Sequence, residues 1–542
     1  SNSSAASDVY KRQDIRSIER YLGIFLLISG VLSFLPAVVA YRYDEPIIPH
    51  LIAGVLSCFC GLFFIRSPRR ELKFGDAMLL TAISLLVISF FGAIPFFMTL
   101  KGSSVDNLVD GYFESISGYT TTGLTILDDE LNPRSNSYLH STIFRRTLSE
   151  WIGGLGIIVL FLSILARGGI STVYLYKMEV GAERITPSVE HTAKIIFRVY
   201  LFYTLVGIIL LWIINNDVFY SITAIMSTLA TGGFIFLDQG FKVNNLLSMS
   251  VLTIFMLIGA IPFTLHYMLF SGNWRKFFRN IEIRTLCWII AISLLFFVVL
   301  SWDDIIYQGI SILENSFLAV ISAVTTTGNT GLDLHSVGNV EKFILITLTI
   351  VGAGAGSTCG GLKLIRFAVL MKAIQWLITK SSLPDTAVVP LKLGKRIFTD
   401  KELRIISLFF FIYIILMFAG MLILLIFGVG PEGGGIEPID ALMLSASAQG
   451  TSSMTNLNIN PQPIVVKIFL IFQMIAGRLE IFPILALIGY LIHGAKTEAI
   501  ILEHEVVEVE HKMLDNIERD IEIVEDRLER YKEKVRGIGK KK

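Results

Sequence analysis

The stretch AVTTTGNT at residues 323–330 is a short run rich in Thr and Gly that lies between two long apolar segments. The same layout recurs as YTTTG at 119–123, as LATG at 229–232 and, more loosely, as SAQG at 447–450. Four such loops in one chain predict a single ring built from four similar parts.

The composition places this ring in a membrane. Of the 542 residues, 53% are hydrophobic and 17% are charged, which is far from the balance of a soluble domain. Several stretches of about twenty residues carry almost no charge, and a helix of that length spans the ~30 Å hydrocarbon core. The chain is therefore predicted to be an all-α polytopic membrane protein. Its formal net charge of +1 indicates nothing about its partners.

One pattern repeats four times after two leading spans at about 21–40 and 48–64. It consists of a long span, a short amphipathic run, a Thr/Gly-rich loop and a second long span. The amphipathic runs are about a dozen residues long, too short to cross a bilayer, so each is predicted to be a half-helix. The second spans are expected at 143–166, 246–270, 341–375 and 464–493. The expected segments are an N-terminal segment at 1–20, the leading helices within 21–70, units at 71–170, 190–272, 282–378 and 401–494, and a C-terminal helix at 495–542.

Charge placement predicts the orientation of these units. Lys and Arg gather at 66–73, 275–284 and 363–404, and no basic residue lies between Arg404 and Lys467. By the positive-inside rule the basic segments are cytoplasmic, so the loops open outward and both termini lie inside. Each unit crosses twice and returns to the same face, so the four are related by an axis along the membrane normal. This predicts pseudo-fourfold symmetry around a central pore.

Loops of this kind suit a monovalent cation. Non-helical backbone at membrane depth must face protein or water, and inward-pointing carbonyls can replace the water of a cation. Gly permits the backbone dihedrals that such a loop needs. The C-terminal ends of the half-helices carry partial negative charge, which also favours cations.

Further motifs accompany the loops: FRRTLSEWIGGLG at 144–156, GSTCGGLK at 356–363 and GRLEIF at 477–482. Together they resemble the Trk/Ktr/HKT superfamily of potassium transporters, specifically its TrkH-type pore subunits, from the first span to about residue 493. The resemblance implies two leading helices, four helix–pore loop–helix repeats and a homodimer in the lipid bilayer. It also implies K⁺ uptake, regulated by a cytoplasmic TrkA-type nucleotide-binding ring that docks on the basic inner loops.

The resemblance also implies which residues form the filter. Its glycines are Gly123, Gly232, Gly328 and Gly450, and the residues just before each glycine supply the carbonyls. In plant relatives, Ser in place of the first glycine accompanies sodium transport, so four glycines favour potassium. The expected K⁺-binding residues are Thr121, Thr122, Gly123, Ala230, Thr231, Gly232, Thr326, Thr327, Gly328, Ala448, Gln449 and Gly450.

A second Gly-rich stretch, 352–361, lies where the second span of unit three should cross the bilayer centre. A phosphate-binding loop is disfavoured because Leu362 stands where the Walker lysine should be. Close packing of helices through small residues is one interpretation. The resemblance implies another, a flexible intramembrane gate. The expected gate residues are Gly352, Gly354, Gly356, Ser357, Thr358, Gly360, Gly361 and Arg478.

Arg478 lies about fifteen residues into the last span, near mid-membrane at about 1.5 Å per residue. A charge at that depth normally faces a polar interior. It either pairs locally with Glu480 or a backbone carbonyl, or forms a positive barrier that touches the gate. Both can hold.

Acids crowd the outer face and as a set would concentrate cations at the mouth. Glu114, inside the first half-helix, is the one expected to bear on the filter. The others are Asp106, Asp110, Asp128, Asp129, Glu130, Glu432, Glu437 and Asp440.

The competing functions are weaker. An intramembrane enzyme would need a nucleophile–base pair or metal ligands, and His504 and His511 lack the HExxH spacing. A protein that only anchors the C-terminal helix to the membrane would not need the repeated Thr/Gly-rich loops. We therefore expect a potassium uptake protein in a prokaryotic plasma membrane, with K⁺ as the transported ion, no covalent cofactor and no nucleic acid. A Na⁺-permeable or ion-coupled (H⁺ or Na⁺ symport) transporter of the same fold is the alternative. Apolar heptads in the tail predict a cytoplasmic helix, either a coiled coil or packed on the membrane domain.

Overall fold

The computed structural model describes most of the expected membrane domain. The described ranges are 18–68, 74–99, 104–127, 139–156, 189–234, 246–302, 310–384, 389–394, 396–479, 483–484 and 487–489. Residues 16–484 form one compact unit, to which every element below belongs. The predicted C-terminal helix at 495–542 and nearly all of the segment 1–20 lie outside the described residues.

Two helices precede the four repeated units. The first runs over Ile18–Arg42 and includes α2 (Phe34–Arg42), and α3 (Ile48–Phe64) packs against α2. Gly61 lies so close to the first helix that an added Cβ would stand 2.8 Å from the carbonyl oxygen of Gly23. Small residues at the contact therefore let the two backbones approach, as is common between helices in membranes.

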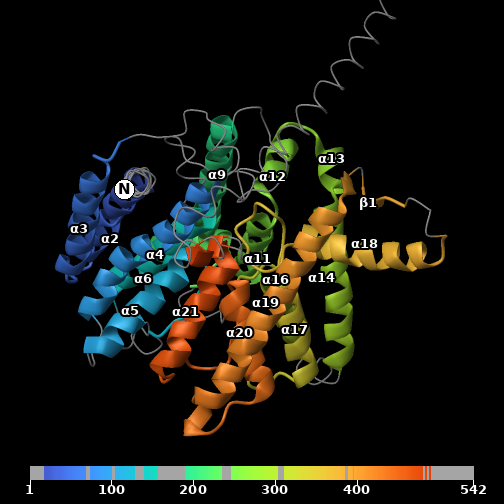
Figure 1. The fold of residues 1–542 in the computed structure, drawn as a ribbon. Helices are drawn as coiled ribbons and strands as arrows, with labels where there is room; N and C mark the ends of the chain where they lie inside the picture. Colours follow the sequence, from blue (N-terminus) through green and yellow to red (C-terminus); the bar gives the residue numbers. More distant parts are fainter. Residues whose placement is uncertain are drawn as a thin grey trace, which may run out of the picture. The chain divides into compact units, whose positions relative to one another are not determined.

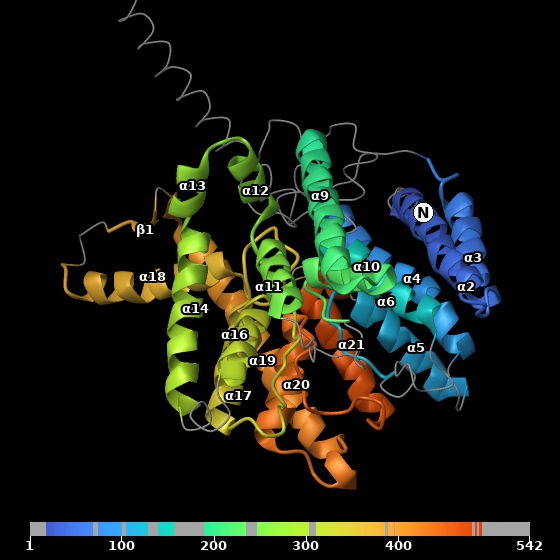
Figure 2. The same ribbon diagram turned by 180° about the vertical axis from the view of Figure 1, so that it is seen from behind.

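Each of the four units contains a long helix and a short helix, and Figures 1 and 2 show them in chain order from blue to red. The long helix of each unit packs along the short helix that follows it. The long helices are α4 (Phe74–Thr99), α9 (Val189–Asn215), α14 (Ile281–Leu300) and α19 (Asp400–Phe427). The short helices are α5 (Ser104–Tyr119), α10 (Val218–Leu229), α16 (Ile310–Val324) and α20 (Pro438–Gly450).

Local sequence signals begin several of these helices. The Asp217 side chain accepts the N–H of Tyr220 at the start of α10. Thr399 and Glu402 form a capping box at the start of α19, in which each side chain accepts an N–H that the helix leaves unpaired. Pro438 occupies the first turn of α20, where its missing N–H removes nothing.

A third helix of each unit completes a closed ring. These helices are α6 (His140–Leu155), α11 (Leu246–Ala260), α17 (Asn339–Val351) and α21 (Ile464–Leu479). Each packs on its own short helix and on the short helix of the following unit: α6 on α10, α11 on α16, and α17 on α20. The cycle closes because α21 of unit four packs on α5 of unit one. Two inter-unit ion pairs follow the same cycle, Lys342–Asp440 at 2.8 Å and Lys467–Asp110 at 2.6 Å.

Three of these third helices, α6, α11 and α17, are interrupted where the sequence predicts long uniform spans. α6 ends at Leu155, before Gly156 with φ +77°; the remainder of the expected 143–166 span lies outside the described residues. α11 is bent by 104° from α12 (Phe263–Phe270), because Pro262 at the break offers no N–H to continue the helix. α17 ends at Val351, and the chain resumes as α18 (Leu364–Ser381), which runs across the direction of α14 in both views (Figures 1 and 2).

Within the described residues, five helices are long and apolar enough to cross a membrane, or six if α11 and α12 count as one span. They are the first leading helix and the four long helices of the units, with the bent pair as the sixth. One feature departs from an all-helical fold. Strands β1 (Leu391–Leu393) and β2 (Arg396–Phe398) form a small antiparallel hairpin between units three and four.

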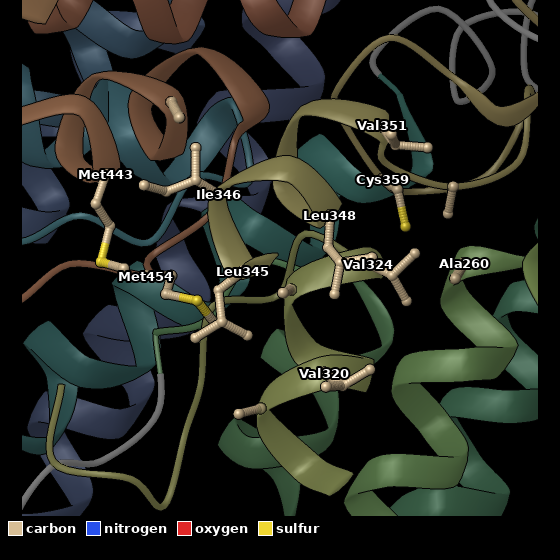
Figure 3. Close-up of a cluster of buried hydrophobic side chains, with 14 of the residues drawn as sticks. Ala260, Val320, Val324, Leu345, Ile346, Leu348, Val351, Cys359, Met443 and Met454 are labelled. Atoms are coloured by element: carbon tan, nitrogen blue, oxygen red, sulfur yellow. The ribbon is translucent and has the colours of Figure 1, made fainter. Parts of the chain in front are cut away.

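A cluster of buried apolar residues supports the third loop, and Figure 3 shows part of it. Val320 and Val324 of α16 lie beside Leu345 and Leu348 of α17. Cys359, from the segment after α17, is buried in the same cluster. The loop that follows α16 is therefore anchored on a dense apolar base.

Candidate functional site

All four short helices end in the same backbone turn. A threonine in each loop adopts the left-handed region, with φ between 51° and 55°. The N–H of the following residue donates to the carbonyl of a serine five positions earlier. The threonines are Thr121, Thr231, Thr326 and Thr451, and the serines are Ser117, Ser227, Ser322 and Ser447. The left-handed backbone conformation costs a residue with a Cβ roughly 1–2 kcal/mol. Because a threonine carries this cost at the same position in all four loops, the turn is a shared structural feature of the four units.

This turn fixes which residues of the four loops are geometrically equivalent. Two residues after each threonine stand Gly123, Gly233, Gly328 and Ser453. In loop two the geometric equivalent of Gly123 is thus Gly233, one residue beyond the predicted filter glycine Gly232. In loop four it is Ser453, three residues beyond the predicted filter glycine Gly450. This quartet therefore holds three glycines and one serine, whereas the assignment of filter residues stays a prediction.

The difference between Gly450 and Ser453 in loop four has a physical origin. Gly450 is the last residue of helix α20, and Ala448 and Gln449 also lie within that helix. The side chain of Gln449 donates to the carbonyl of Tyr413 at 2.9 Å, away from the loop that follows. Helix α20 therefore includes Ala448, Gln449 and Gly450, which the sequence analysis assigns to the fourth loop.

The quartet lines a cavity of about 440 Å³ whose wall is partly polar and partly apolar. Gly123, Gly233, Gly328 and Ser453 all border it. The polar side chains around it belong to Thr125, Arg146, Asn329, Thr330, Asp333, His335, Thr455, Asn456 and Asn458, and the apolar side chains belong to Leu124, Phe234, Leu332, Leu334, Leu457 and Ile459. The four loops thus meet at one concave space.

The four loops meet closely because the glycines lack side chains. An added Cβ on Gly123 would overlap the carbonyl oxygen of Gly232, and one on Gly328 would overlap the backbone N of Ser453. Gly123 and Gly328 also have φ of +76° and +88°, which L side chains rarely adopt. Both space and backbone conformation therefore demand glycine here.

Glu114 is fully buried and does not line the cavity. Its carboxylate accepts a hydrogen bond from Nε of Arg146 at 2.5 Å and another from the backbone N–H of Ile126 at 3.1 Å. Glu114 therefore holds the segment that follows loop one. The Arg146 guanidinium stacks 3.9 Å from the centre of the Phe234 ring, and Glu150 accepts the N–H of Phe234 at 3.0 Å. The same network thus braces loops one and two.

Arg146 and Glu150 were not singled out as site residues by sequence reasoning. The motif FRRTLSEW contains them both, and charged residues inside a predicted span are the signal that could have found them. Two predicted mouth acids are also partnered, since Asp110 and Asp440 form the inter-unit pairs with Lys467 and Lys342. Asp128, Asp129 and Glu130 lie outside the described residues, and of Glu432 only the backbone is described.

The Gly-rich segment of unit three is non-helical over 352–363 and lies directly against the loops. The Thr358 hydroxyl contacts that of Thr231 at 3.0 Å, and Cys359 Sγ donates to the Thr325 carbonyl at 2.9 Å. The N–H of Gly360 donates to Thr326 Oγ1 at 3.0 Å. Loops two and three are therefore bonded to this segment.

The same segment satisfies the backbone of the broken span in unit two. The N–H of Gly354 donates to the Ala260 carbonyl at 3.1 Å, and the N–H of Phe263 donates to the Gly356 carbonyl at 3.2 Å. Neither break could be buried alone, because unpaired backbone groups at membrane depth cost several kcal/mol each. The helix break in unit two and the non-helical segment in unit three therefore satisfy each other's backbone hydrogen-bonding groups.

Arg478 connects three parts of the site. Its guanidinium donates to the carbonyl of Thr358 at 2.6 Å, to Thr121 Oγ1 at 3.3 Å and to the carbonyl of Gly153. The contacts with backbone carbonyls and with the Gly-rich segment are thus both present, as the sequence led us to expect. The alternative partner Glu480 lies outside the described residues.

Closed packing of four helix–loop units, together with five helices among the described residues that are long and apolar enough to cross a membrane, defines a class, the helical membrane proteins. The family described as "TrkH: Cation transport protein" matches residues 57–494. The chain belongs to this family, and it is accordingly a membrane transporter and not an enzyme.

Individual relatives are similar over nearly their whole length. An uncharacterized cation transporter of Methanocaldococcus jannaschii is 30% identical and is aligned over 89% of this chain and 96% of its own. The Trk system potassium uptake protein TrkH of Salmonella typhimurium is 28% identical over 87% of this chain and 98% of its own. The crystal structure of the potassium transporter TrkH from Vibrio parahaemolyticus superposes with a TM-score of 0.75 at 26% identity. It covers 87% of this chain and 98% of that one.

Proposed function

We propose that this protein takes up K⁺ through the constriction formed by its four loops. The observation that carries the proposal is the fourfold repetition of one strained turn, which brings four short-helix C-termini to one constriction. Partial negative charge at those helix ends favours a cation, and backbone carbonyls suit one that has lost its water. Two of the relatives above are named for potassium.

The coordinating carbonyls are those of the residues just before the quartet: Thr122, Gly232, Thr327 and Ser452. This set keeps the carbonyls of Thr122 and Thr327 from the sequence prediction, and it replaces that of Thr231 by Gly232 and that of Gln449 by Ser452. We further propose that the segment 352–363 is the gate and that Arg478 is a positive barrier beneath the filter. Its contact with the Thr358 carbonyl supports both assignments.

The surroundings of the pathway are part of the same proposal. The basic segments, 275–284 among them, face the cytoplasm of a prokaryotic cell, with both termini inside. They offer a surface for a TrkA-type nucleotide-binding ring, and the protein acts as a homodimer. Several relatives are named components of a Trk system, which supports a regulatory partner.

Ion flux into proteoliposomes that contain the purified protein tests the function. We expect uptake of K⁺ and Rb⁺ to exceed that of Na⁺ and Li⁺. Protein-dependent flux of none of these ions, or of Na⁺ alone, would refute K⁺ uptake. Passive conduction needs no second gradient, so K⁺ uptake that stops without an H⁺ or Na⁺ gradient would favour symport.

Gly328→Ser tests whether the constriction carries the flux. The new side chain would overlap the backbone N of Ser453, so we expect K⁺ flux to fall by more than tenfold. Gly272→Ser is a matched control, because Gly272 also has a positive φ, +77°, yet nothing lies within 4 Å of its added Cβ. Equal flux in the two variants would remove the constriction from the pathway.

Arg478→Ala tests the barrier. The change deletes a positive charge and its hydrogen bond to the Thr358 carbonyl, and hydrogen bonds to charged groups contribute about 1.5–3 kcal/mol. We expect basal K⁺ flux to rise several-fold, with Arg478→Lys between Arg478→Ala and wild type because it keeps the charge. Unchanged flux in the alanine variant would reject the barrier role.

A further inference from the structure

The break between α11 and α12 interrupts the hydrogen bonding of three carbonyls at the end of α11. In a continuous helix the carbonyls of Ile258, Gly259 and Ala260 would accept the backbone N–H groups four residues later. The first of these N–H groups does not exist, because residue 262 is a proline. Unpaired carbonyls at membrane depth cost several kcal/mol each, so the protein has to supply other donors.

The Gly-rich segment 352–363, called the gate segment below, supplies donors for two of these carbonyls. Thr358 donates to the Gly259 carbonyl with its backbone N–H at 3.1 Å and with its hydroxyl at 3.0 Å. The N–H of Gly354 donates to the Ala260 carbonyl at 3.1 Å. An added Cβ on Gly354 would overlap the ring of Pro262. The helix break and the gate segment are therefore bonded closely enough that a movement of one requires a movement of the other.

The third carbonyl is satisfied by the side chain of His266 on α12. Nε2 of this buried histidine donates to the Ile258 carbonyl at 3.0 Å, and so replaces the N–H that Pro262 lacks. A carbonyl only accepts, so Nε2 carries the ring hydrogen and Nδ1 is left as an acceptor. Nδ1 accepts the hydroxyl of Tyr203 on α9 at 3.1 Å. The Tyr203–His266 pair therefore ties the break to the long helix of unit two.

Helix α12 also contacts the basic inner segment. Leu265, the residue before His266, packs with Phe277 of α13 (Trp274–Arg279) and with Ile283 at the start of α14. Helix α13 overlaps the basic segment 275–284, which the proposed function offers to a cytoplasmic partner. Helix α12 thus connects that surface to the gate segment, and His266 lies on this connection.

We propose that Tyr203 and His266 are positioning residues of the gate. Their hydrogen bond holds α12, and with it the gate segment, in the arrangement in which Arg478 donates to the Thr358 carbonyl. This inference rests on the proposed function, which makes Arg478 a barrier and that arrangement the shut one. Loosening the pair lets the break and the gate segment move together, and it raises the K⁺ flux that occurs without a partner.

The test measures basal K⁺ flux in proteoliposomes for wild type, Tyr203→Phe, His266→Leu and the double variant. Tyr203→Phe deletes one hydroxyl and should raise the flux several-fold. His266→Leu also removes the donor to the Ile258 carbonyl, so the flux should rise further. The double variant should match His266→Leu, because the hydroxyl acts only through the imidazole. His266→Gln, whose amide can donate to that carbonyl, should lie closer to wild type than His266→Leu.

Tyr267→Phe is the matched control. Tyr267 is the next residue of α12, and its hydroxyl makes no hydrogen bond within the part of the chain that the structure describes. Its flux should equal that of wild type. Thermal unfolding of every variant is measured beside the flux, because a merely structural role of the pair would lower the unfolding midpoint and the flux together. A role in the gate raises the flux.

The outcomes separate this inference from the proposed function. Wild-type protein that carries no K⁺ refutes the function and this inference with it. Normal wild-type flux, with Tyr203→Phe and His266→Leu at or below the wild-type level, overturns the role of the pair and leaves K⁺ uptake intact. Equal increases in Tyr267→Phe and Tyr203→Phe also overturn it. If His266→Leu fails to fold, the flux of Tyr203→Phe alone decides.

Discussion

Loops one and four share the same backbone turn, yet different chemistry holds them in place. In unit one, the fully buried Glu114 and Arg146 form an ion pair at 2.5 Å beside the loop. In unit four, neutral amides do the same work, because Gln473 Nε2 donates to Ser445 Oγ at 2.8 Å and to Gln449 Oε1 at 3.2 Å. The backbone geometry is common to the two units, whereas the supporting side chains are not.

The comparison explains why the fourth repeat is hard to recognise. Only the serine and threonine that make the turn recur in all four loops, at a fixed spacing of four residues. The other positions of the turn differ between at least two of the loops. Removing one member of the Glu114–Arg146 ion pair should therefore change the stability of the protein differently from removing one of the amide side chains in unit four.

Glu114→Gln should have the largest effect. It leaves the Arg146 guanidinium buried without its counter-charge, and breaking a buried pair costs about 3–5 kcal/mol. We expect a large loss of folded protein on heating, measured by size-exclusion chromatography in detergent, and a loss of K⁺ flux. Glu114→Gln combined with Arg146→Gln should regain part of the stability, because no unpaired charge remains. A single variant as heat-resistant as wild type would show that the ion pair does not hold loop one.

Lys467→Met should have a smaller effect, at the contact where units four and one meet. Lys467 and Asp110 retain 6% and 14% side-chain exposure, so water partly compensates the loss of a bond worth about 1.5–3 kcal/mol. Lys342→Met removes the equivalent pair with Asp440 and should lower the midpoint of thermal unfolding to a similar extent. Midpoints that differ widely between the two variants would contradict the equivalence of these inter-unit contacts.

Gln473→Leu should have the smallest effect. It removes neutral hydrogen bonds worth about 0.5–1.5 kcal/mol each and leaves no buried charge. We expect a modest fall in the unfolding midpoint, less than for Glu114→Gln, and K⁺ flux within a few-fold of wild type. Gln375→Leu, at an exposed glutamine on α18, is the control and should not change the midpoint. A collapse as severe as that of Glu114→Gln would mean that amides and ions brace the loops equally.

The interruption of the third unit's second span was predictable in position but not in its partners. A Gly-rich interruption of an apolar span is visible in the sequence, and the structure places a non-helical segment there, over 352–363. The sequence has no signal that this segment bonds to the break before Phe263, since those residues lie about ninety positions apart in the chain. Backbone groups released by two separate helix breaks find one another only in the folded protein.

The sequence by itself determined that four half-helices end in Thr-rich loops within an apolar chain, because length, apolarity and local polar residues act over neighbouring positions. It also contained the spacing of serine and threonine that identifies the turn. Only the tertiary structure decided the register, which makes Gly233 and Ser453 partners of Gly123 and Gly328. The reason is that equivalence around a ring depends on where helix α20 ends and on which atoms meet across the axis. Neither is a property of any one loop.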